Sequence, residues 1–415
     1  MTQSFSNYYA ILDIDNFKHF LTAKVTLDYL IKKENTTKLV FYIHKDLKIH
    51  NISSENLDTY EVGNDVEEWS PFISESKKIT INLKKSIQKG ETVNIYFEYS
   101  GHITIIKDSE INRISDYYTE LGIYSPWFPL SESLDKAYFN VKITTDNENI
   151  VVGNNSKQEK NHWIINQKIP TSDCTFLISK YFKDNKYEAN FGNVCISIYY
   201  IENKHKPISK FLQERISVIL KNYTTTFGHI DSQYISIVIV PRIQGGGYCR
   251  PGLIILPDRN TANSHYKYQS ENEEKYYFKY LAHELAHLWW SKASVSTWED
   301  WLNESFAEFS CLSATRNYYG EEEFIKTINK YKDNIKDLPP IKGLDRNNEK
   351  AFDVLYTKGP VLLYELEQEI GRDTFKKLLN CIHTSKVANT DMFLNKLLEL
   401  TKNDIVNNFI KKLES

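Results

Sequence analysis

The chain has 415 residues, more than one ordinary domain needs and enough for two or three. Hydrophobic residues make up 41% and charged residues 25%, a globular composition that excludes a wholly disordered chain. The 51 basic residues are balanced by 54 acidic ones, for a net charge of -3. Nucleic acid is therefore not expected as a principal partner, because proteins that coat phosphate backbones are usually basic.

The first part of the chain shows the period-two alternation of strands that bury one face. The alternating apolar rows are 25–31, 79–83, 93–99 and 141–143. From about residue 187 the pattern changes to a strand at 194–201, a helix at 207–227 and a strand at 235–240, and beyond Glu271 it is mostly helical. The sequence thus predicts an α+β chain with an antiparallel β-sandwich-like domain over residues 1–186 and an α/β-to-α domain over residues 187–415.

Cysteine usage and the N-terminus bear on location. The five cysteines are widely spaced and form no CxxC pair, so neither a disulfide framework nor a cysteine-ligated zinc site is predicted. The segment up to Phe20 has no basic stretch followed by a continuous apolar run, and no apolar run of about eighteen residues occurs. We therefore expect no signal peptide and no membrane insertion, and a cytoplasmic location.

The segment 280–290 contains an HExxH motif, formed by His283, Glu284 and His287. Residues four apart lie on one helix face, so the two imidazoles can reach one metal ion. Glu284 sits beside them, placed to accept a proton from metal-activated water. Alone, the motif also fits a buried helix with two hydrogen-bonded core histidines. The carboxylates that follow it favour the metal site.

A second predicted helix, at about 300–318, carries these carboxylates. A catalytic zinc site commonly has three protein ligands, and two His with one Glu is a standard set, which makes Glu304 the expected third ligand. Glu308 lies one turn further along the same face. There it can accept the outer N–H of a ligand histidine, although it also fits a surface carboxylate of an amphipathic helix.

The motif His283-Glu-Leu-Ala-His287 followed by Trp301-Leu-Asn-Glu304-Ser-Phe-Ala resembles the M1, or aminopeptidase N-like, zinc metallopeptidases. The segment Tyr356-Thr-Lys-Gly359 resembles their Y-x-K-G motif. The resemblance implies a thermolysin-like catalytic domain with one Zn²⁺ per chain, held by His283, His287 and Glu304. It implies that Glu284 is the general base, that Tyr356 stabilises the oxyanion, and that the substrate is a peptide.

Two departures from the family pattern concern the catalytic segment. Sixteen residues separate His287 from Glu304 where the family usually has eighteen, and we expect the shorter connection to leave Glu304 in place. The exopeptidase motif G-x-M-E-N is absent, and the corresponding segment begins with Gly245, Gly246 and Gly247.

Within that segment Cys249 stands about where the family places the glutamate that binds the substrate's α-amino group. A thiol is a poor partner for an ammonium group, so amine capture should be weakened. Arg250 next to it is a candidate for reading a substrate carboxylate or carbonyl, or a plain surface arginine. Glu120, nine residues before Pro129, resembles a position where the family's N-terminal domain contacts the amine, and it is a candidate replacement.

The leading hypothesis is therefore a zinc peptidase of aminopeptidase type with altered N-terminal recognition. An endopeptidase or a protease specialised for one precursor peptide is an alternative, because the resemblance stops before the helical C-terminal domain that covers the cleft in many family members. A non-hydrolytic binding module that keeps the fold is a further alternative. The sequence predicts neither the oligomeric state nor the peptide sequence preference.

Overall fold

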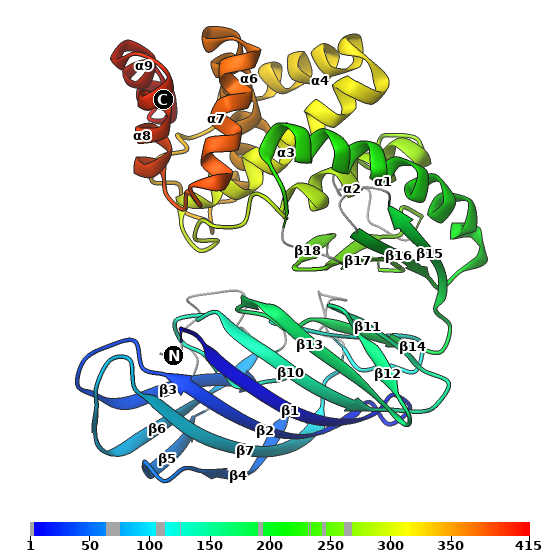
Figure 1. The fold of residues 1–415 in the computed structure, drawn as a ribbon, viewed down its shortest axis with the longest axis vertical. Helices are drawn as coiled ribbons and strands as arrows, with labels where there is room; N and C mark the ends of the chain where they lie inside the picture. Colours follow the sequence, from blue (N-terminus) through cyan, green and yellow to red (C-terminus); the bar gives the residue numbers. More distant parts are fainter. Residues whose placement is uncertain are drawn as a thin grey trace.

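The computed structural model describes residues 4–63, 75–104, 113–124, 126–189, 194–230, 232, 234–242, 246–260 and 268–415. Figure 1 shows a β-rich N-terminal domain at one end of the molecule and a domain with a small sheet and many helices at the other. This confirms the predicted α+β class, with the β domain first in the chain. Among the described residues, no helix combines the length and apolar character that a membrane crossing requires.

The N-terminal domain is built from strands that alternate buried and exposed residues, as the sequence predicts. Its strands are β1 (Ser6–Asp15), β2 (Phe20–Leu30), β3 (Thr36–His44), β4 (Leu47–Ser53), β5 (Leu57–Gly63), β6 (Ser76–Ile87), β7 (Thr92–His102), β8 (Thr119–Leu121), β9 (Leu130–Ser131), β10 (Ala137–Thr144), β11 (Ile150–Gly153), β12 (Lys157–Glu159), β13 (His162–Thr171) and β14 (Phe176–Ser179).

These strands form three sheets around one apolar core. The largest has the order β12-β13-β10-β1-β2-β7-β4, a second has the order β5-β6-β3-β9, and a small third has the order β11-β14-β8. Pairing is antiparallel except between β1 and β10, which run parallel. The apolar rows of β2, β6, β7 and β10 face the core between the sheets, which is what period-two alternation requires.

The second domain begins with a sheet of β15 (Lys183–Ala189), β16 (Val194–Tyr200), β17 (Tyr234–Val240), β18 (Tyr248–Arg250) and β19 (Leu253–Pro257). Its order is β15-β16-β17-β19-β18; the three middle strands are parallel and β18 is an antiparallel edge strand. Since β15 starts at Lys183 and pairs with β16, the predicted boundary at 186/187 falls inside a strand of this sheet. The polar sequence of β15 gave no alternation from which to recognise it.

Helices cover one face of this sheet and continue beyond it (Figure 1). They are α1 (Lys206–Phe227), α2 (Glu273–Ala286), α3 (Trp301–Tyr319), α4 (Glu321–Asn334), α5 (Ala351–Asp353), α6 (Gly359–Ile370), α7 (Arg372–Thr384), α8 (Thr390–Leu400) and α9 (Asn403–Leu413). Short 3₁₀ turns occur at Asn203–His205 and Trp298–Asp300, and a π-helical segment, Val354–Lys358, joins α5 to α6. Helix α3 packs against α2, α4 and α6, so it lies at the centre of the helical layer.

The two domains meet in a shared apolar cluster. Tyr118 and Leu177 of the N-terminal domain pack with Val238, Tyr248 and Ile255 of the sheet of the second domain. All five side chains are at most 8% exposed. Burial of this kind favours a fixed placement of the β domain beneath strands β17 to β19.

Candidate metal centre and active site

Helix α2 presents the two histidines of the HExxH motif. Asn272 caps the helix by accepting a hydrogen bond from the backbone N–H of Lys275, and no glycine or proline interrupts the sequence that follows. Every residue from Tyr276 to Ala286 is buried. His283 and His287 lie one turn apart with ring centroids 5.0 Å from each other, as their spacing predicts.

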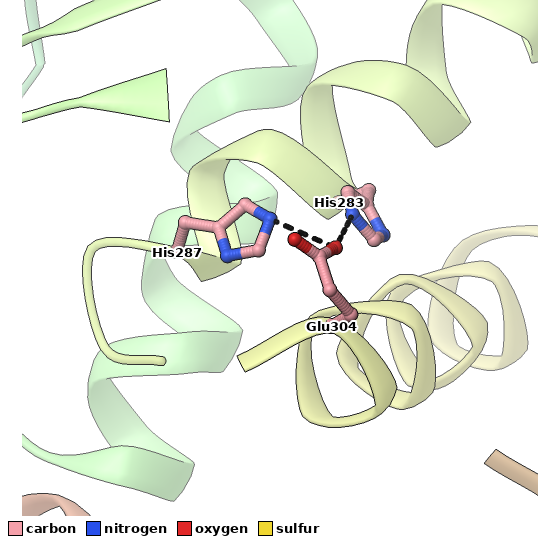
Figure 2. A group of neighbouring side chains, drawn as sticks. All are labelled: His283, His287 and Glu304. Carbon is pink, nitrogen blue, oxygen red and sulfur yellow. Dashed lines mark ion pairs between the residues drawn. The ribbon is translucent and has the colours of Figure 1, made fainter. Parts of the chain in front are cut away.

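Helix α3 brings Glu304 to the same point, so that its carboxylate lies between the two imidazoles (Figure 2). Glu304 Oε2 is 3.4 Å from Nε2 of His283 and 3.5 Å from Nε2 of His287. Tetrahedral zinc with bonds of about 2.0–2.1 Å separates its ligand atoms by about 3.3–3.4 Å, so these distances fit. Oε2 is buried and has no well-formed hydrogen bond within the described part of the chain. The three residues therefore fit a zinc ion.

The outer nitrogen of each histidine is held by a hydrogen-bond acceptor. His283 Nδ1 lies 3.0 Å from Glu308 Oε2, and His287 Nδ1 lies 3.0 Å from the backbone oxygen of Trp290. When Nδ1–H donates, Nε2 keeps its lone pair and points at the metal position. Glu308 thus contacts the outer nitrogen of a candidate ligand histidine, as expected. The contact of His287 with the Trp290 backbone oxygen could not be predicted, because every residue has such an oxygen.

The negative charge of Glu304 and the positive charge of a protonated His287 stabilise each other. Burial by itself raises the pKa of Glu304, but the charge of His287 and the close polar contacts of both histidines outweigh burial and hold this pKa well below its usual range. Burial by itself lowers the pKa of His287, but the charge and close contact of Glu304 outweigh burial and raise this pKa to about 9. The site therefore favours one cationic species against Glu304, either a proton or a metal ion.

The short connection between helices α2 and α3 is held in place by hydrogen bonds from a side chain of α3. The side chain of Asn303 accepts from the backbone N–H of Ala293 at 3.2 Å and donates to its carbonyl oxygen at 3.1 Å. The same amide donates to Asp300 Oδ1 at 2.8 Å. With these contacts the sixteen-residue connection still delivers Glu304 to the histidines, as expected.

Tyr356 lies on the π-helical segment, beside the candidate metal position. Its ring stacks on that of His283 with centroids 5.5 Å apart. Burial raises the pKa of the Tyr356 hydroxyl well above the usual value. The negative charge of Glu304 and the hydrogen bond between this hydroxyl and Glu304 raise the pKa further. The phenol is therefore neutral at physiological pH and can donate a hydrogen bond beside the metal position. Glu284 is 5% exposed, and its charge acts on the same hydroxyl.

The glycine and lysine that follow Tyr356 fix the π-helical segment in place. A Cβ on Gly359 would lie 1.9 Å from Ser305 Oγ and 2.4 Å from Ser305 Cβ, so only glycine fits against α3 here. Ser305 also donates to the backbone oxygen of Leu355 at 2.7 Å. Lys358 Nζ donates to the carbonyl oxygens of Leu338 and Pro339 at 3.2 and 2.9 Å. These contacts couple Tyr356 to the helix that carries Glu304.

The glycine-rich segment lies against helix α2. A Cβ on Gly247 would lie 2.6 Å from the backbone oxygen of Ile255 and 3.1 Å from the ring of Tyr280, so glycine is required for this close approach. Gly246 lies beside the Tyr280 hydroxyl, with 3.9 Å to a Cβ built on it. Gly245 lies outside the described residues. The assignment of this segment to substrate binding stays a prediction.

Cys249 is on edge strand β18 and packs against the apolar cluster that includes residues of helix α2. Burial and the charge of Glu284 raise the pKa of its thiol, so it is uncharged at neutral pH. The thiol therefore lies within the electrostatic reach of Glu284 but provides no anion for a substrate amine.

Arg250 and Glu120 belong to the contact between the domains. Arg250 Nε donates to Asp173 Oδ2 at 2.5 Å, and its guanidinium packs over the ring of Tyr248. Glu120, expected near the substrate amine, is fully buried: Arg242 Nη2 donates to its Oε2 and the Tyr248 hydroxyl to its Oε1, both at 2.6 Å. With both oxygens engaged inside the protein, this geometry does not support Glu120 as a free amine-binding carboxylate. The sequence could not reveal Arg242 as its partner.

Residues 211–413 match the peptidase family M1 domain. Over this stretch, which is just under half of the chain, the protein is similar to the M1 peptidases. Aminopeptidase 2 of Candida albicans is 22% identical over 404 residues, which cover 88% of this chain and 42% of that protein. The chain spans less than half the length of the curated relatives to which it is similar.

Solved structures share the fold across the whole molecule. An M1 zinc metallopeptidase from Deinococcus radiodurans superposes with a TM-score of 0.74 at 15% identity, covering 100% of this chain and 95% of that one. Leukotriene A4 hydrolase from Saccharomyces cerevisiae superposes with a TM-score of 0.73 at 16% identity, covering 97% of this chain and 66% of that one. At these identities the likeness concerns the fold of both domains.

Proposed function

We propose that this chain is a zinc-dependent peptidase of M1 type that binds one zinc ion through His283, His287 and Glu304. The observation that carries the proposal is the position of Glu304 Oε2, 3.4 and 3.5 Å from the two Nε2 atoms that face it. Glu284 and Tyr356 surround the same point. A non-hydrolytic binding module has no need for all five groups, so their presence together favours hydrolysis.

Zinc bound there would polarise the scissile carbonyl and lower the pKa of the attacking water. Glu284 takes the proton of that water as general base and then delivers it to the leaving amine. The Tyr356 hydroxyl, protonated at neutral pH, donates a hydrogen bond to the developing oxyanion. Glu308 and the Trp290 carbonyl keep both imidazoles in the tautomer that leaves Nε2 free.

The proposed subclass is an aminopeptidase-type enzyme with altered N-terminal recognition. Supporting it, the sequence relatives are aminopeptidases, and the Deinococcus radiodurans neighbour has a form solved with a Tyr-Ser-Ala substrate, with a TM-score of 0.71. An endopeptidase is the second candidate, favoured by two observations. Cys249 offers no anion to an α-amino group, and Glu120 is paired with Arg242.

One experiment separates these readings. A peptide is supplied with a free and with an acetylated N-terminus, and the products are mapped by mass spectrometry. Release of single N-terminal residues from the free peptide alone supports the aminopeptidase subclass, whereas internal cleavage of both forms at equal rates supports the endopeptidase. The matched control is Glu284→Gln, which should bind zinc and cut neither. Absence of cleavage by zinc-loaded wild type across a peptide library would refute peptide hydrolysis.

A further inference from the structure

Glu308 lies in the centre of a buried hydrogen-bond cluster behind the metal position. Its side chain is fully buried, and its contacts in the described part of the chain include the following three groups. His283 Nδ1 is 3.0 Å from Oε2, the hydroxyl of Tyr268 donates to Oε2 at 2.6 Å, and the hydroxyl of Tyr331 donates to Oε1 at 2.8 Å. The three donors come from helix α2, from the segment before it and from helix α4.

A buried carboxylate needs its oxygens satisfied, and the direction of its donors sets its orientation. With one tyrosine on each oxygen, the carboxylate of Glu308 cannot rotate without losing at least one hydrogen bond. Burial raises the pKa of both phenols well above the ordinary value, so each donates at neutral pH. The two tyrosines thus hold Oε2 where His283 Nδ1 reaches it.

The backbone of Tyr268 adds an independent observation. Its φ is 63°, in the left-handed region that non-glycine residues seldom adopt. Its ring packs edge-on against that of Tyr280 with centroids 5.4 Å apart, and its hydroxyl also lies 3.5 Å from Cys311 Sγ. A phenol held in an unfavourable backbone conformation with its hydroxyl on Glu308 indicates a functional constraint at this position.

We propose that Tyr268 and Tyr331 are positioning residues that tighten zinc binding by fixing Glu308, which in turn fixes the imidazole of His283. This inference rests on the proposed zinc site. The causal order is specific: the tyrosines act on Glu308 and not on the metal, and Glu308 acts on the orientation and basicity of His283. Loss of such outer hydrogen bonds typically weakens metal binding about 10- to 100-fold.

The test uses Tyr268→Phe and Tyr331→Phe in the full chain, which keep the rings and remove only the hydroxyls. Zinc dissociation constants are measured by competition with a chromophoric chelator. We expect each variant to bind zinc about tenfold more weakly than wild type. The matched control is Tyr276→Phe, on helix α2 itself, whose buried hydroxyl donates to the backbone oxygen of Pro257 at 3.3 Å and should leave zinc affinity within about twofold.

Four outcomes decide between these possibilities. Unchanged zinc affinity in both variants overturns the inference, even if the zinc-free proteins melt earlier, because the tyrosines would then be structural only. Equal weakening by Tyr276→Phe overturns it too. Tyr331→Phe is also combined with Glu308→Ala, and in this background it should not weaken zinc binding any further. If Tyr331→Phe weakens zinc binding by the same factor with and without Glu308, the tyrosine does not act through Glu308. A wild-type chain that binds no zinc refutes the proposed function itself.

Discussion

Gly359→Ala is predicted to disturb both stability and turnover, because the structure leaves no room for one methyl group. The new Cβ would lie 2.4 Å from Ser305 Cβ, whereas ordinary contact begins near 3.4 Å, so the π-helical segment and α3 must separate by about 1 Å. Ser305 Cβ is fixed by the helix and cannot rotate away. Overpacking of this kind costs about 1–3 kcal/mol, and the short contact places this site near the upper value.

The displaced segment carries Tyr356, and its neighbour α3 carries Glu304. A cost of about 3 kcal/mol corresponds to a melting temperature lower by about 6–12 °C for a domain of this size. A misplacement of about 1 Å near the reacting groups can lower kcat by about 100-fold. Calorimetry and steady-state kinetics of zinc-loaded protein measure the two effects.

Ser305→Gly in the same chain provides the rescue. It removes both clashing atoms, and the nearest remaining atom of residue 305 is Cα at 3.7 Å. The double variant should regain most of kcat, while the glycine in α3 and the lost hydrogen bond to Leu355 leave it about 1–2 kcal/mol less stable than wild type. The reasoning is refuted if Gly359→Ala melts within about 2 °C of wild type with unchanged kcat.

Three further predictions concern the proposed chemistry and the domain contact. Glu284→Gln should retain zinc but lose turnover by about 100- to 10,000-fold, and undiminished turnover would remove Glu284 as the base. In the zinc-free site the pKa of His287 is about 9, so zinc must displace a proton from His287 at neutral pH. The dissociation constant for zinc should therefore fall about tenfold per pH unit from about pH 7 to 9 and level off above about pH 9. A zinc affinity that does not change with pH in chelator competition would contradict this prediction. Glu120→Ala should lower stability by about 3–5 kcal/mol in denaturant unfolding, because Arg242 is left buried and unpaired. A raised KM for peptides with a free amine at unchanged stability would instead restore Glu120 as an amine ligand.

The candidate metal ligands were predictable because helix geometry relates neighbouring positions within each of the two helices. Four-residue spacing alone places His283 and His287 on one face of α2, and the same periodicity on α3 relates Glu304 to Glu308. The β structure of the N-terminal domain was predictable because it too depends on local spacing. Apolar residues at every second position bury one face of a strand. Strand β15 could not be predicted from alternation, because most of its residues are polar and it lies at the edge of its sheet.

Composition, motifs and periodicity thus determined the fold class, the candidate zinc ligands and the order of the domains. Only the tertiary structure decided what surrounds them. It pairs Glu120 with Arg242, gives His287 the carbonyl of Trp290, and brings Tyr268 and Tyr331 onto Glu308. These partners are set by how helices and domains pack, and residues far apart in the chain carry no spacing rule that reveals such contacts.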